Sequence, residues 1–254
     1  MPAPMLPSCV APLMAPLLAW VAWSSGTTRV ESFVVGDPTA GGAEPVAVVS
    51  LRAVARAGHL LLEQDVTFRA AGVRVLHDEH RETDGWHLVR RELRGPESPG
   101  RSWIAEPDGD GLRLLRFGSS RPVHGRVAGS PRMPLELLES LRRGEPVGER
   151  VLLLDPLGEG LVSVDVRVRT GDPRTERPAP RSRTVALVRA DGSLLGRYVF
   201  EGTSLVAFQW QDGSRWARRT DEEEVQRRAE EWRVERDPLA EVWEAVRSGR
   251  IRRW

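Results

Sequence analysis

The sequence predicts a mainly β protein of the α+β class, built as a curved antiparallel sheet or incomplete β-barrel with one central helix and two C-terminal helices. Short runs rich in Val, Leu and Phe alternate with polar residues, and turn signals recur roughly every ten residues, as in an antiparallel meander. Helical periodicity is confined to residues 134–143 and to the chain after residue 219. With 254 residues, 40% of them hydrophobic and 29% charged, the chain has enough apolar material for one domain and a tail.

Two-residue turns ending in glycine are the clearest hairpin signals. They lie at Asp84-Gly85, Asp191-Gly192, Glu201-Gly202 and Asp212-Gly213. Asp before Gly suits a hairpin turn with positive φ at both central residues. The last three turns would join strands at residues 184–190, 193–200, 203–211 and 214–219. In that register Val188 faces Leu195, Val185 neighbours Tyr198, and Tyr198 faces Leu205. Apolar pairs then share one buried face.

Further strands are expected on either side of the central helix. Their ranges are residues 45–57, 61–70, 73–82, 86–94, 101–106, 112–117, 150–154 and 161–169. Residues 171–183, rich in Pro and charge, have nothing to bury, so we expect an exposed loop there.

Residues 134–143 carry the signals of a helix. They begin with Pro134, end in two arginines, and are followed by Gly144. Leu135, Leu138 and Leu141 form one apolar stripe.

Two more helices are expected in the tail. The first begins with a capping box from Thr220 to Glu223, and the second begins at Asp237-Pro238 and ends at Gly249. Their apolar faces hold Val225, Ala229 and Trp232 in the first, and Leu239, Val242, Trp243 and Val246 in the second. This divides the chain into an antiparallel β domain at residues 27–219 and a helical tail at residues 220–254, which folds back on the sheet or docks a protein partner.

Residues 1–26 are expected to be a signal peptide or N-terminal anchor. Residues 10–23 are apolar and precede small residues, as in an export leader, and are short for a membrane span. No basic residue precedes them, and two prolines interrupt them. We expect export to the periplasm or cell envelope, with membrane contact only through the leader; a retained anchor and a cytosolic protein stay open. The single cysteine, Cys9, lies in the leader, so the mature chain would have no disulfide or thiolate ligand.

Composition and motifs exclude several functions. The formal net charge of +1 gives no bulk attraction to nucleic acid. The absence of Lys and Asn indicates a GC-rich bacterium, although a preference for guanidinium groups is the alternative. No Gly-x-Ser-x-Gly elbow, P-loop or dinucleotide fingerprint is present. The sequence therefore favours a non-catalytic protein with no cofactor, except for one candidate divalent metal site.

That site is the histidine cluster around the turn at Asp84-Gly85. If these two residues form the loop, His80, Glu82 and His87 share one face with Asp78. A loop from Thr83 to Gly85 would instead group His77, Glu79 and His87. The candidate ligands are therefore His77, His80, Glu82 and His87, since imidazole and carboxylate groups on a hairpin can share a metal. Arginines nearby make a solvated face with ion pairs the alternative.

Tryptophan is abundant, with nine residues. Those on expected strands are Trp86, Trp103, Trp210 and Trp216. They predict core packing, or alternatively an aromatic-lined groove for a lipid or glycan if several share a concave face.

The order of elements resembles the LolA-like open β-barrels of the periplasm. A leader is followed by long hairpins, then the central helix PLELLESLRR, and then strands ending in VALVRADGSLLGRYVFEG. The resemblance covers residues 45–218 as architecture, without a shared motif. It implies a curved sheet around helices, with a cavity for acyl chains, and the carriage of a lipid or lipoprotein.

Three functions follow. The first is a non-catalytic exported envelope protein that binds a lipid, lipoprotein or other apolar ligand in the curved sheet. The second is an assembly protein whose C-terminal helices dock a partner. The third is a metal-dependent enzyme centred on His77, His80 and His87.

Overall fold

The computed structural model describes most of the chain between the expected leader and the end of the first tail helix. The described residues are 27–36, 44–56, 58–69, 74–82, 85–94, 102–109, 111–117, 123–128, 131–154, 161–171, 182–209 and 215–232. The predicted leader, the second tail helix, and residues 172–181 of the predicted loop lie outside these ranges.

The described chain forms one antiparallel sheet of 14 strands. The first half contains β1 (Thr28–Gly36), β2 (Ala47–Arg56), β3 (His59–Phe68), β4 (Arg74–Glu82), β5 (Gly85–Arg94), β6 (Ser102–Asp108), β7 (Gly111–Phe117) and β8 (Val123–Ala128). The second half contains β9 (Arg150–Leu154), β10 (Leu161–Thr170), β11 (Ser182–Arg189), β12 (Leu194–Glu201), β13 (Ser204–Gln209) and β14 (Trp216–Thr220).

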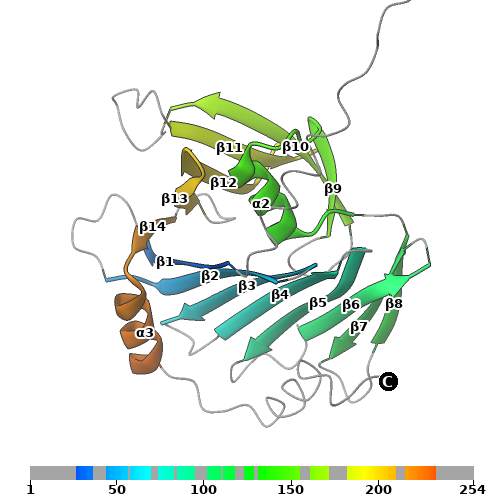
Figure 1. Ribbon diagram of the computed structural model, residues 1–254, viewed down its shortest axis with the longest axis horizontal. Coiled ribbons are helices and arrows are strands. Elements are labelled where there is room, and N and C mark those ends of the chain that lie inside the picture. Colours follow the sequence, from blue (N-terminus) through cyan, green and yellow to red (C-terminus); the bar gives the residue numbers. More distant parts are fainter. Residues whose placement is uncertain are drawn as a thin grey trace, which may run out of the picture.

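Two meanders make up this sheet. Strands β1 to β8 are neighbours in chain order, as are β9 to β14, and β1 pairs with β14 to join the two halves. Figure 1 shows β1–β8 as one layer and β9–β13 as a second, with helix α2 (Pro134–Arg143) between them. Within the described residues, no ladder joins β8 to β9, and a single parallel bridge links Arg132 to Leu153 of β9. The predicted antiparallel, incompletely closed sheet is therefore confirmed.

The concave face of the sheet holds the main core. Alternate residues of each strand point to it, so that Phe33 pairs with Val49 and Val49 with Val66 on successive strands. Leu135, Leu137, Leu138 and Leu141 of α2 join this core. The helix thus fills the concave side with aliphatic side chains, an arrangement that shields both the helix and the two sheet layers from water.

A second apolar cluster lies toward the unpaired strands. It joins Trp103, Ala105 and Leu114 of β6 and β7 with Met133, just before α2, and Leu154 of β9. Side-chain packing therefore connects the two sheet layers on the side where no strand ladder does.

Helix α2 has the predicted boundaries, Pro134–Arg143, and ends at Gly144 with a φ of 70°. The backbone N–H of Gly144 donates to the carbonyl of Leu141, and that of Glu145 donates to Ser140. Glycine adopts this left-handed conformation at little energetic cost, whereas a residue with a Cβ is strained in it.

Replacing Gly144 with alanine is expected to lower the free energy of unfolding by about 1 kcal/mol. Among the described residues, the nearest atom to an added Cβ is Arg183 Nη1 at 4.0 Å, so the cost comes from φ and not from a clash. Chemical denaturation measures the change. Gly36→Ala is the matched control, because Gly36 lies in β1 without a positive φ, and no atom of the described residues lies within 4 Å of its added Cβ. Equal losses in both variants would contradict the backbone explanation.

Helix α3 (Glu222–Glu231) packs beside β1 and β2 (Figure 1). Its N-cap is Asp221, whose side chain accepts the backbone N–H of Glu224 at 2.7 Å. The capping box predicted from Thr220 is therefore wrong by one residue: Asp221 is the better acceptor, and Thr220 is the last residue of β14.

Strands β1 and β8 were not predicted from the sequence. The other twelve strands were predicted, with ends displaced by a few residues.

Two β-bulges changed the predicted side-chain pairs in the last hairpins. Val185 pairs with Tyr198, as predicted. Val188, however, pairs with Leu194 after a register shift, and Tyr198 pairs with Phe208. The turn after β12 is made by residues 202–203, since Glu201 pairs with Ser204, and not by Glu201-Gly202. A bulge adds one residue to a strand, and the pattern of apolar residues alone does not locate it.

Candidate functional site

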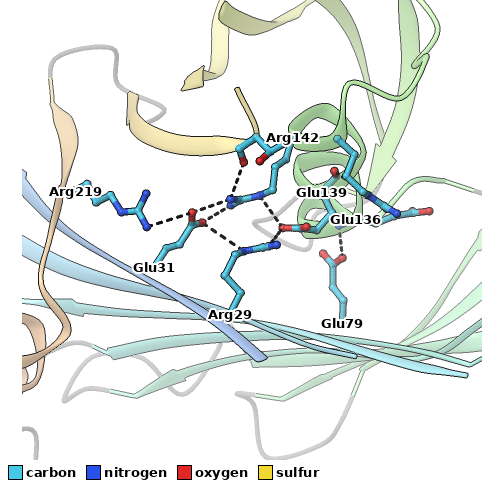
Figure 2. A network of polar contacts seen from close by, with 9 residues as sticks. Arg29, Glu31, Glu79, Glu136, Glu139, Arg142 and Arg219 are labelled. Atoms are coloured by element: carbon cyan, nitrogen blue, oxygen red, sulfur yellow. Dashed lines mark hydrogen bonds and ion pairs between the residues drawn. The ribbon is translucent and has the colours of Figure 1, made fainter. Parts of the chain in front are cut away.

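A cluster of charges lies between α2 and the concave face of the sheet, and we call it the interior charge cluster. It consists of Arg29 and Glu31 of β1, Glu139 and Arg142 of α2, and Arg219 of β14. Figure 2 shows the β1 side chains pointing toward the helix, with Arg219 approaching Glu31 from the side. Because β1 pairs with both β2 and β14, the cluster sits where the two meanders meet.

Arg142 and Glu31 form its buried centre. The two side chains are 4% and 2% exposed and make a bidentate pair, in which Arg142 Nη1 donates to Glu31 Oε1 at 2.7 Å and Nη2 donates to Oε2. Arg142 also donates to the backbone carbonyl of Thr203 at 3.2 Å. Burial alone would lower the pKa of Arg142, but its hydrogen bond to Glu31 and the charges of Glu139 and Glu31 outweigh burial and raise it.

Glu139 links the helix to β1 a second time. Its carboxylate lies 3.2 Å from Arg142 Nε and also accepts a hydrogen bond from Arg29. Arg219 contributes a longer contact, 4.0 Å from Glu31, and is 45% exposed. Three guanidinium groups therefore surround two buried carboxylates, which compensates the cost of burying each carboxylate as an ion.

Glu79 of β4 binds the start of α2. Its carboxylate accepts the backbone N–H groups of Leu135 at 2.7 Å and Glu136 at 2.8 Å. The residue at the N-cap is Met133, which offers no capping oxygen, so a fully buried glutamate from a distant strand supplies it. A negative charge here also complements the positive end of the helix dipole.

Glu136 adds a second link at the same helix end. Burial raises its pKa above the usual value, against the opposing effects of its hydrogen bond with the Met133 N–H and of the charge of Arg81. Arg81 of β4 lies 3.5 Å from the Glu136 carboxylate.

The other end of α2 is held by β11. Arg183 donates a hydrogen bond to the carbonyl of Leu141, and its guanidinium lies 5.1 Å from the centre of the Phe200 ring. Helix α2 is thus attached at both ends by charged side chains from strands on both meanders, with its leucines packed between these attachments.

The structure divides the predicted histidine site between the two faces of the sheet. Glu82 pairs with Gly85, so neither loop considered from the sequence is right, and a register shift follows between His80 and Arg81. His77 points to the concave side, where its Nε2 lies 2.9 Å from Glu79 and its ring meets Trp103 edge-on. His80 and Glu82 differ from His77 by an odd number of residues along β4 and so lie on the convex side. The side chain of His87 lies outside the described residues.

His80 and Glu82 share the convex face with a residue that sequence reasoning missed, His59 of β3. One ligand atom from each of His59, His80 and Glu82 lies within 4.8 Å of the others. The ring centroids of the two histidines are 5.9 Å apart, and His59 Nδ1 is 3.8 Å from Glu82 Oε1. In the β3–β4 hairpin Leu60 pairs with Arg81, which places His59 at the level of Glu82. The register of this hairpin is the signal that could have identified His59 from the sequence.

The tryptophans that the structure describes do not line one groove. Trp103 belongs to the cluster on the concave side, whereas Trp216 packs with Val199 and Ala207 on the other side of the sheet. Core packing therefore accounts for both of these residues, and the side chains of Trp86 and Trp210 lie outside the described residues.

Tyr198 offers a spectroscopic test of the interior. Burial raises the pKa of its phenol from 10.0 to about 12, with a smaller contribution from the negative charge of Glu79. Because this is the only tyrosine, ultraviolet absorbance of tyrosinate should report it alone, with a midpoint near pH 12 in the native protein and near 10 in denaturant.

The same shift predicts alkaline destabilisation. Above pH 10 the unfolded chain releases the proton that the native chain keeps, so the contribution of Tyr198 to stability is full below pH 10 and is lost as pH rises to about 12. A native midpoint near 10 would contradict the packing of this phenol against the rings of Phe200 and Phe208.

No protein-family model and no curated protein matches the chain. Among solved structures, the crystal structure of a beta-barrel-like protein of a domain of unknown function, DUF1849, from Brucella abortus is similar at 8% identity and a TM-score of 0.38, covering 76% of this chain and 95% of that one. Among the residues that the structure describes, no helix has the length and apolar character needed to cross a membrane.

Proposed function

We propose that this protein is a non-catalytic exported protein of the cell envelope that binds a lipid, lipoprotein or other apolar ligand on the concave face of its sheet. In this proposal α2 occupies the ligand site and is displaced, wholly or in part, when the acyl chain binds. The likeness in element order to LolA-like open β-barrels fits the same proposal. The observation that carries it is the attachment of a short leucine-rich helix to an apolar sheet face through charged side chains at both helix ends.

The apolar part of the contact supports exchange with a lipid. The hydrophobic part of the surface beneath α2 consists of aliphatic and aromatic side chains, and the helix meets it with leucines. An acyl chain presents the same methylene surface, and burial of apolar area has little dependence on which hydrocarbon provides it.

The charged contacts between α2 and the sheet support a single position of the helix in the absence of ligand. A buried ion pair adds little net stability compared with apolar residues of the same volume, yet it specifies one arrangement of the groups. The pair between Glu31 and Arg142 and the cap by Glu79 fix the helix axially. Loss of the charged contacts at both ends would leave α2 held by its four leucines, which makes these contacts suitable for a two-state element.

Titration of the purified chain with cis-parinaric acid tests the proposal. We expect saturable binding, and we expect Leu138→Ala to bind the probe about tenfold more tightly, because weaker packing of α2 raises the population of the state with an open site. Leu138 is 6% exposed within the core, whereas Leu152 of β9 is 42% exposed. Leu152→Ala is therefore the matched control, with the affinity unchanged.

Two results would overturn this function. One is the lack of saturable binding by the intact chain. The other is equal affinity in Leu138→Ala, Leu152→Ala and the unaltered chain, with circular dichroism showing that all three are folded, since the probe would then bind away from α2. Export is tested separately by the N-terminal sequence of protein recovered from the envelope of an expressing bacterium, which should begin near residue 27.

Docking of a protein partner through the C-terminal helices stays a prediction. Within the tail, α3 lies against β1 and β2, and its residue Val225 is buried there. The apolar face predicted after Asp237 lies outside the described residues.

A further inference from the structure

We propose that His59, His80 and Glu82 bind one divalent transition-metal ion of the zinc class on the convex face of the sheet. This inference is independent of the proposed lipid binding, because the three residues lie on the other side of the sheet from α2. It also differs from the predicted set of His77, His80, Glu82 and His87, since His59 joins His80 and Glu82 whereas His77 lies on the other face.

The geometry of the β3–β4 hairpin brings the three side chains together. His80 and Glu82 are two residues apart on β4 and share its convex face, and His59 begins β3 at the same end of the hairpin. Two ligands come from one strand and one from its hydrogen-bonded neighbour, so the backbone spacing is set by the sheet and not by a loop.

The distances suit a shared ion. Zinc binds imidazole nitrogen and carboxylate oxygen at about 2.0–2.2 Å, so two ligands of one tetrahedral ion lie roughly 3–3.5 Å apart. His59 Nδ1 and Glu82 Oε1 are 3.8 Å apart, and the full set lies within 4.8 Å. Small side-chain rotations close this gap, and the side chain of His59 is 54% exposed, which leaves room for them.

The charges on the convex face distinguish Glu82 from the neighbouring acids. Glu63 pairs with Arg52 at 3.2 Å, and Asp65 pairs with Arg74 at 2.9 Å. Glu82 instead lies against an imidazole. A divalent cation at this position would compensate the carboxylate and use both imidazoles as ligands.

The donor set indicates the class of metal. Two imidazoles and one carboxylate suit zinc and its neighbours better than calcium or magnesium, which prefer oxygen ligands. Three protein ligands leave a fourth position for water or for a group from another molecule.

Titration with Zn²⁺ of an untagged full chain in a Cys9→Ser background, first freed of metal by a chelator, tests the site. The background removes the only thiol. We expect one equivalent to bind, with NMR shifts in the ring signals of His59 and His80 but not of His77. His59→Gln and Glu82→Gln should each weaken binding at least about tenfold.

His124→Gln is the control, because His124 lies in β8, at the far edge of the sheet order from the β3–β4 hairpin. It should bind Zn²⁺ like the unaltered chain. Failure to bind one equivalent, or unchanged affinity in His59→Gln, would overturn the proposal. Neither result bears on cis-parinaric acid binding, so the two proposals fail separately.

Discussion

Replacing Arg142 with methionine is expected to lower the free energy of unfolding by about 3–5 kcal/mol. The substitution keeps an unbranched side chain but removes the guanidinium that pairs bidentately with Glu31 and lies 3.2 Å from Glu139. Two carboxylates that are 2% and 5% exposed would then share the remaining arginines. The cost comes mainly from leaving Glu31 ionised without its buried partner, and chemical denaturation monitored by circular dichroism measures it.

Arg150→Met is the matched control for this prediction. Arg150 pairs with Asp165 at 2.9 Å, but its side chain is 73% exposed, so the loss should be about 1 kcal/mol or less. The double variant with Glu31→Leu and Arg142→Met should recover much of the stability lost by Arg142→Met, because no lone charge remains at the centre of the cluster. Similar losses in Arg142→Met and Arg150→Met would show that the interior charge cluster is solvated.

Replacing Glu79 with alanine is expected to lower the free energy of unfolding by about 2–4 kcal/mol. The variant removes the acceptor of two backbone N–H groups, those of Leu135 and Glu136, at a helix end that water does not reach freely. It also removes the hydrogen-bond partner of His77 Nε2. Glu79→Gln should cost less than Glu79→Ala, because one oxygen remains as an acceptor although the charge near the helix dipole is lost.

Asp221→Ala tests whether burial is the reason for the size of this effect. Asp221 caps α3 through the N–H of Glu224, but it lies on the surface, where water replaces the lost acceptor. We expect a loss of about 1 kcal/mol. If Glu79→Ala costs no more than Asp221→Ala, the carboxylate of Glu79 contributes only an ordinary surface cap.

Both predictions concern contacts between residues that are far apart in the chain. Glu31 and Arg142 are separated by 111 positions, and Glu79 and Leu135 by 56. In the sequence, Arg142 is one of two arginines at a helix end, a common surface pattern, and Glu79 is one acid among several charges on a strand. No local signal marks either as buried, because burial depends on which strand lies opposite.

The histidine cluster illustrates the same limit at shorter range. The sequence identified His80 and Glu82 as neighbours on one face, which follows from the two-residue period of a strand. It assigned His77 conditionally, because the turn after β4 was not fixed by the sequence. It missed His59, because the register of the β3–β4 hairpin places that residue beside His80 and Glu82. A one-residue change in register moves a side chain to the other face.

Local periodicity and turn residues determined much of this protein from the sequence alone: twelve of the strands, the antiparallel class of the sheet, and α2 from Pro134 to its glycine end. These features depend on interactions within a few residues. Only the tertiary structure decided that β1 joins β14, that α2 lies on the concave face, and that Glu31 and Glu79 hold it there. These contacts join residues that are far apart in the chain and that no local sequence pattern connects. They therefore stabilise the protein only once the sheet has curved around the helix.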